Sequence, residues 1–251
     1  MTLREADIAA FYRDAYAPSA DAEVYGRWRA LSAIAKADHV IALAATIGLS
    51  SPRVVADVGC GDGSVLAELG RRGFGSRRVG FEIAAAAVEM AAGRSEIAEA
   101  AVFDGEHVPA ADGAYDLAYA SHVLEHVPSP GRLLREMMRV ARAVVIEVPL
   151  ERNLSARRPA ARAASEAAGH IQRFDRTGVR ELITGAGWQV RGEILDPLGL
   201  AVHLFDHSSF VARAKGTGKW AVRRAAAAVP PVGARIFTLH YAVIATPLSD
   251  R

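Results

Sequence analysis

The sequence predicts an α/β fold in which a mostly parallel sheet carries helices on both faces. Short apolar segments alternate with segments of helical periodicity along most of the chain. A glycine-dense turn, residues 59–63, directly follows the first apolar segment, and polar residues stand where the later ones end. Such alternation is typical of parallel sheets, because parallel neighbours need a crossover connection that is usually a helix.

Each element follows from local pattern. Strands are predicted for apolar runs bounded by turn residues, namely residues 53–59, 77–83, 99–105, 115–121, 142–149, 187–196 and 235–246. Helices are predicted where apolar residues recur at helical spacing, namely 3–16, 26–47, 64–72, 84–92, 130–140 and 176–185. Gly73 ends the third of these helices and Pro149 closes the fifth strand.

The elements divide the chain into a cap and a core. Residues 1–47 are predicted to form an N-terminal helical cap, and residues 48–251 the α/β domain. Two insertions interrupt that domain, at about 151–174, which is rich in arginine and alanine, and at about 197–234, which has a less regular pattern.

Composition indicates a folded cytoplasmic protein. A hydrophobic content of 51% with 23% charged residues excludes a disordered chain. The net charge of +2 argues against a nucleic-acid partner. Cys60 is the single cysteine, which excludes an intrachain disulfide and fits a reducing compartment. We find no apolar signal core at the N-terminus and no 18-residue uncharged apolar run, so no membrane association is expected, and the oligomeric state stays open.

The residues after the first two strands favour a nucleoside ligand, because parallel sheets bind ligands at the carboxyl ends of their strands. Asp57 comes just before Gly59 and Gly61, and glycines let the backbone approach a ligand closely. Glu82 ends the second strand, 23 residues past Gly59. A carboxylate at that place can accept hydrogen bonds from both hydroxyls of a ribose.

The end of the third strand completes an adenosine pocket. Asp104 can accept a hydrogen bond from an exocyclic amine, while the backbone N–H of Gly105 can meet a ring nitrogen. A dinucleotide is disfavoured, because its G-x-G-x-x-G fingerprint would need glycine where Ser64 stands, and because Asp57 would repel a pyrophosphate. S-adenosylmethionine carries an ammonium and a sulfonium and no phosphate, so it is the predicted cofactor.

Five segments in order resemble the motifs of class I S-adenosylmethionine-dependent methyltransferases, including the type 11 small-molecule enzymes: "VVADVGCGDG", "VGFEI", "FDGEHVP", "YDLAYASHVLEHVPSP" and "AGW". The resemblance covers about residues 50–196 and the final strand. It implies a Rossmann-like, seven-stranded sheet whose last strand is antiparallel. It also implies cofactor contacts from Asp57 and Gly59 at the amino-acid part, Glu82 at the ribose, Asp104 and Gly105 at the adenine, and Ser121 beside the methionine, with Gly61 and Ile83 as further cofactor-binding residues.

A group of histidines raises the question of a metal. His122, Glu125 and His126 fall at i, i+3 and i+4, one face of a helical turn, and His170 follows later. Two histidines and a carboxylate can bind a metal ion. The arrangement resembles, with His122 in place of Glu, the E-x-x-E-H then H site of small-RNA 3′-terminal 2′-O-methyltransferases. The L-E-H-V turn also occurs in metal-free methyltransferases, so no metal is assigned.

The predicted function is methyl transfer from S-adenosylmethionine to a small-molecule acceptor, through an oxygen nucleophile. An oxygen acceptor needs a base, and His170 and His126 are the predicted catalytic residues. His170 is the preferred base, because it precedes a helix that leads into the sixth strand, whereas His126 lies in the L-E-H-V turn, where packing also explains it. His122 is a further candidate, and His207 and His240 are remoter ones. Two alternatives stay open: an RNA 2′-O-methyltransferase with a metal site, and a non-catalytic S-adenosylmethionine-binding module.

Overall fold

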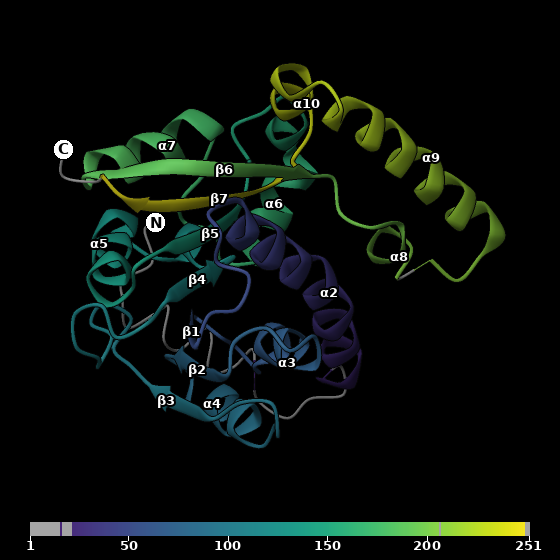
Figure 1. The fold of residues 1–251 in the computed structure, drawn as a ribbon. Coiled ribbons are helices and arrows are strands. Elements are labelled where there is room, and N and C mark those ends of the chain that lie inside the picture. Colours follow the sequence, from purple (N-terminus) through teal and green to yellow (C-terminus); the bar gives the residue numbers. More distant parts are fainter. Residues whose placement is uncertain (1–15, 17–21, 206, 249–251) are drawn as a thin grey trace.

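A seven-stranded sheet forms the centre of the computed structural model, which describes residues 16, 22–205 and 207–248 (Figure 1). The strands lie in the order β3-β2-β1-β4-β5-β7-β6. Their bounds are β1 Val54–Val58, β2 Arg77–Glu82, β3 Glu99–Val102, β4 Leu117–Ser121, β5 Val144–Pro149, β6 Trp188–Asp196 and β7 His240–Pro247. Strand β7 is antiparallel to β5 and β6, and the other pairs are parallel. The predicted sheet with an antiparallel last strand is confirmed.

Helices cover both faces of the sheet. Their bounds in the described part of the chain are α2 Ala22–Thr46, α3 Ser64–Arg71, α4 Ala85–Ala92, η1 Leu124–His126, α5 Pro130–Val140, η2 Ser155–Arg157, α6 Pro159–Ala167, α7 Arg176–Gly185, α8 Leu200–His203, α9 Phe210–Ala227 and α10 Pro230–Ile236. Leu43 of α2 and Leu66 of α3 belong to a buried apolar cluster on one face. Leu134 of α5 and Ile183 of α7 belong to a second cluster on the other face.

The stretch expected to be irregular, residues 197–234, is largely helical, and this expectation is wrong. It contains α8, α9 and the start of α10, and α9 extends away from the sheet in Figure 1. Gly216 and Gly218 weaken the helical pattern within α9. Ser209 nevertheless caps the helix, because its side chain accepts a hydrogen bond from the backbone N–H of Ala212.

The last strand begins later than its sequence suggests. Residues 235–239 were included in the predicted strand, but α10 ends at Ile236 and β7 starts at His240. The predicted helix at 3–16 lies outside the described residues, apart from Tyr16, which is in a turn. Within the described ranges, the helices include none that has both the length and the apolar character needed to cross a lipid bilayer.

The order of strands determines where a ligand can bind. The chain runs from β1 to β2 and β3 on one side and returns to β4 and β5 on the other. The winding therefore reverses between β1 and β4, and their carboxyl ends leave a crevice there. The glycine turn follows β1, and the histidine-rich segment follows β4.

Helix α2 packs as part of the core, so removing its buried side chains will destabilise the fold. Leu43 is 1% exposed, whereas Ile34 of the same helix is 44% exposed. We expect Leu43→Ala to lower the free energy of unfolding by about 2–5 kcal/mol, because the change leaves a cavity against the sheet. Urea denaturation measures it, with Ile34→Ala as the matched control. Equal and small losses for both variants would show that α2 does not contribute to the core.

Candidate functional site

A pocket of about 320 Å³ lies at the carboxyl ends of the central strands. Every residue that the sequence predicts for the cofactor lines this pocket: Asp57, Gly59, Gly61, Glu82, Ile83, Asp104, Gly105 and Ser121. They converge because β2, β1 and β4 are adjacent and parallel, so that their carboxyl ends meet at one edge.

The turn after β1 requires glycine for two reasons. Gly59 and Gly61 adopt φ angles of +82° and +53°, a left-handed conformation that other residues rarely take. A Cβ atom at Gly59 would also lie 2.4 Å from a methyl group of Val123. The backbone N–H groups of Gly59 and Cys60 donate to the carbonyl of Phe81, at 2.7 and 3.0 Å, and so join the turn to β2.

Glu82 holds the same turn from the side of β2. One carboxylate oxygen accepts the N–H of Gly61 at 2.9 Å, and the other accepts the N–H groups of Ile83 and Ala84 at 2.7 and 3.2 Å. The side chain is buried, and this burial raises the pKa of Glu82 although the three N–H groups lower it. A carboxylate offers about four acceptor sites, so one remains for a ligand hydroxyl.

Asp57 and Ser121 are polar groups at the pocket wall, one a buried carboxyl group without a salt bridge and the other a buried hydroxyl without a hydrogen-bond partner among the described residues. Asp57 is 2% exposed, and burial raises its pKa to about 7, although Tyr119 and Lys36 lower it. The Oγ atom of Ser121 is buried and has no hydrogen-bond partner within the described chain. Such polar groups at a pocket wall favour a ligand that brings a cation and a hydrogen-bonding group.

Asp104 is the exposed acid of the pocket. Its carboxylate accepts the backbone N–H groups of His107 and Glu106, at 2.7 and 2.8 Å, and pairs with the ring of His107 at 2.9 Å. These contacts, above all the N–H of His107, lower the pKa of Asp104 to about 2. The group is therefore an anion at any physiological pH, and it fixes the loop in which Gly105 adopts a φ of +86°.

Sequence reasoning missed Asp62, which anchors α2 over the pocket. Its side chain accepts hydrogen bonds from the Nε of Arg29 at 3.0 Å and from the hydroxyl of Ser64 at 2.6 Å. Burial opposes its ionisation, yet these bonds and the positive charge of Arg94 lower the pKa of Asp62. The contact with Arg29 spans 33 positions, so no local motif marks it, although an acid between two glycines is a visible signal.

The two predicted catalytic histidines occupy different places. His126 lines the pocket, whereas His170 is not among the described residues that do. Nδ1 of His126 lies 3.1 Å from the carbonyl of Gly169, and because a carbonyl only accepts, Nδ1 carries the proton and Nε2 is the basic nitrogen. Burial lowers the pKa of His126. The His170 ring stands edge-on to it at 4.8 Å and is held by Glu151 at 3.0 Å.

The candidate metal ligands fall into two groups instead of one. Glu125, His126 and His170 each offer a ligand atom within 4.8 Å of the others. His122 lines the pocket, but its Nε2 faces Glu147 and His240, which are outside the predicted set. His122 does not share a helical turn with Glu125. Its backbone has a φ of +60°, which is not helical, and the residue lies before the start of η1. His207 belongs to neither group within the described chain.

Comparison with known sequences places this pocket in a family. A family model described as a methyltransferase domain matches residues 25–193. An uncharacterized methyltransferase of Mycobacterium sp. (strain JLS) is 40% identical over 102 residues, which cover 39% of this chain and 38% of that protein. Ajmaline N-methyltransferase of Rauvolfia serpentina is 28% identical over 149 residues, covering 56% and 51%. These matches span about half the length of the relatives or less.

A solved structure shares the fold. Geranyl diphosphate C-methyltransferase from Streptomyces coelicolor A3(2), in complex with Mg²⁺, geranyl diphosphate and S-adenosyl-L-homocysteine, superposes with a TM-score of 0.62 at 16% identity, covering 85% of this chain and 79% of that one. The family match includes α2 from residue 25 and every strand from β1 to β5. The chain belongs to the methyltransferase domain family, whose cofactor is S-adenosylmethionine.

Proposed function

We propose that this protein transfers a methyl group from S-adenosylmethionine to an oxygen atom of a small-molecule acceptor. The observation that carries the proposal is the composition of one pocket. Asp57, Glu82 and Asp104 line it together with the glycine turn, and His126 lines it as well. The acids suit a cationic nucleoside, and the histidine suits removal of a proton from the acceptor.

The acids and the glycine turn hold the cofactor. Asp57 is available for the ammonium of the methionine part, and the hydroxyl of Ser121 can hydrogen-bond to the same part. Glu82 retains one acceptor site for a ribose hydroxyl. Gly105, which has a φ of +86°, lines the pocket where the adenine is expected. Since the sulfonium makes the methyl group electrophilic, the chain itself has only to align the acceptor and remove its proton.

His126 is the proposed base and His170 its positioning residue. Because Nδ1 of His126 donates to the carbonyl of Gly169, the neutral ring has a basic Nε2. The contact between the two rings and the pairing of His170 with Glu151 restrict how the His126 ring can turn. A fixed ring favours proton removal, because the base must lie within hydrogen-bond reach of the acceptor hydroxyl.

The lining of the pocket and the similar proteins support a small acceptor. Val127, Pro128 and Leu133 give the same pocket an apolar wall. By their names, the similar proteins methylate ajmaline and geranyl diphosphate, both small molecules.

Methyl transfer from labelled S-adenosylmethionine to a panel of phenols, alcohols, amines and RNA tests the proposal. Label in a phenol or alcohol supports it. Label in an amine would support methyltransferase activity but contradict the proposed oxygen acceptor. Label in RNA would favour the alternative of a 2′-O-methyltransferase. Cofactor binding without transfer to any class would favour a non-catalytic module.

Asp57 should reduce the stability of the ligand-free protein as the pH rises. Its folded pKa of about 7 lies above the unfolded value of 3.8, so the folded state binds more protons and loses stability between those values. We expect Asp57→Asn to unfold at a higher urea concentration than the parent at pH 8, with a free energy of unfolding larger by about a few kcal/mol at most, and with little difference at pH 4. The same variant should bind S-adenosylmethionine more weakly. If the free energy of unfolding of the two proteins changed with pH in the same way, this assignment of the pKa would be contradicted.

Removing the proposed base should reduce turnover but not cofactor binding. We expect His126→Ala to lower turnover by roughly 10²–10⁴ with an oxygen acceptor, because the change removes the proposed acceptor of the hydroxyl proton. Steady-state kinetics and calorimetry with S-adenosylhomocysteine measure the two quantities. His203→Ala is the control, since that ring bonds to the carbonyl of Pro197 and does not line the pocket. Full turnover in His126→Ala would refute the role.

A further inference from the structure

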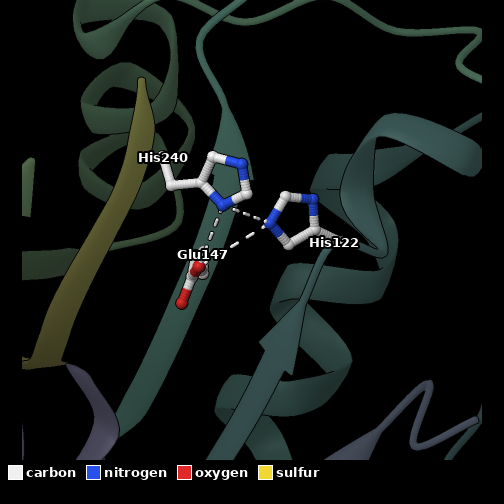
Figure 2. Close-up of side chains that lie close together, drawn as sticks. All are labelled: His122, Glu147 and His240. Carbon is white, nitrogen blue, oxygen red and sulfur yellow. Dashed lines mark hydrogen bonds and ion pairs between the residues drawn. The ribbon is translucent and has the colours of Figure 1, made fainter. Parts of the chain in front are cut away.

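A second group of side chains, beside the cofactor pocket, brings three ligand atoms to one point. His122 follows β4, Glu147 lies on β5, and His240 begins β7. These strands are neighbours in the sheet. Nε2 of His122 therefore lies 2.8 Å from Nδ1 of His240, although the two residues are 118 positions apart in the sequence. Oε1 of Glu147 lies 3.6 Å from the first nitrogen and 3.4 Å from the second. Figure 2 shows both rings turned toward the carboxylate.

A proton alone does not satisfy this geometry. If Nε2 of His122 donates to Nδ1 of His240, the lone pair of Nδ1 also faces the oxygen of Glu147. If Nδ1 of His240 donates instead, the lone pair of Nε2 faces that oxygen. If both nitrogens are protonated, two N–H groups point at each other across 2.8 Å. With one proton between the rings, the two remaining atoms are acceptors that share a single donor.

We propose that His122, Glu147 and His240 bind a divalent transition-metal ion through Nε2, Oε1 and Nδ1. A single cation placed between the three atoms is attracted to the electron pairs of both nitrogens and of the carboxylate oxygen. Zinc bonds to nitrogen and oxygen are about 2.0–2.2 Å long, so donor atoms around one ion lie about 3–3.6 Å apart. The three observed separations, 2.8, 3.4 and 3.6 Å, require only a small adjustment to reach that range.

The surroundings orient the ligands as they do in metal sites. Nδ1 of His122 lies 3.0 Å from Oε1 of the buried Glu125, so this side of the ring faces an acid while Nε2 faces the proposed ion. The second oxygen of Glu147 is held by His39 at 3.1 Å, and His39 is held in turn by Asp196 at 3.3 Å. Two of the three ligands thus have a partner behind them.

The backbone at His122 is a further sign of a built site. Its φ of +60° is uncommon for a residue with a side chain, and such conformations concentrate at ligand-binding positions. It directs the ring between Glu125 and Glu147. The ring also lines the cofactor pocket, so a bound ion would fix one wall of that pocket.

The donor set selects the kind of ion. Two imidazoles and one carboxylate suit zinc, manganese, iron or cobalt and leave coordination positions open, whereas magnesium prefers oxygen ligands. His122 and His240 are 20% and 16% exposed, so an ion can reach them, while Glu147 is 2% exposed. This site is distinct from the Glu125, His126 and His170 group, and the inference does not depend on methyl transfer.

Metal titration of chelator-treated, tag-free protein tests the inference. Calorimetry should show about one Zn²⁺ per chain with a dissociation constant of about 1 µM or lower, and no binding of Mg²⁺. His240→Ala and Glu147→Gln should each weaken Zn²⁺ binding by about a hundredfold or more, and Glu125→Gln by about ten- to a hundredfold. Circular dichroism confirms that each variant is folded.

His170→Ala is the deciding control, because it removes a ligand from the other group only. Unchanged Zn²⁺ affinity in His170→Ala, with loss in His240→Ala, supports the proposed site. Loss in His170→Ala with full affinity in His240→Ala would place the ion at the other group and overturn the inference. Absence of Zn²⁺ binding to the parent protein would also overturn it, while S-adenosylmethionine binding and methyl transfer, measured on the same protein, would be unaffected.

Discussion

The carboxylate of Glu82 is the side chain on which the pocket most depends. It is buried at the end of β2 and accepts three backbone N–H groups, one of them from Gly61 across the gap to the turn after β1. A buried carboxylate is costly unless such donors surround it, and a left-handed glycine turn needs an anchor outside itself. Each therefore stabilises the other. The position of the turn follows from this contact together with the two backbone hydrogen bonds that Gly59 and Cys60 donate to Phe81.

Acids outnumber cations among the described residues that line the pocket: Asp57, Asp62, Glu82, Asp104 and Glu106 against Arg29, Lys36 and Arg132. Asp57 is buried without a salt bridge in the described part of the chain, whereas Asp62 forms ion pairs with Arg29 and Arg94. A ligand with an ammonium and a sulfonium supplies what is missing, and a pyrophosphate does not. The same logic extends along the edge of the sheet, where Glu125 and Glu147 are buried against histidines. The carboxyl edge of this sheet concentrates negative charge.

The fold, and the convergence of Asp57, Glu82 and Asp104 at one pocket, could be predicted because their signals are local. The turn residues follow β1, Glu82 is the last residue of β2 and Asp104 comes two residues after β3, so pattern alone places them at one edge. Contacts that join distant segments could not be predicted in this way. Arg29 meets Asp62 only because α2 packs over the turn, and His240 meets His122 only because β7 enters the sheet beside β5. The late start of β7, at His240 and not at residue 235, determines that contact, and the sequence around it shows no clear boundary.

The central claim is that this acidic pocket selects a cationic nucleoside without phosphates, and competitive calorimetry tests it most directly. The protein is titrated with S-adenosylmethionine, S-adenosylhomocysteine and NAD under the same conditions at neutral pH. The account predicts saturable binding of the first two at one site per chain and little or no binding of NAD. Tighter binding of NAD than of S-adenosylmethionine would contradict it.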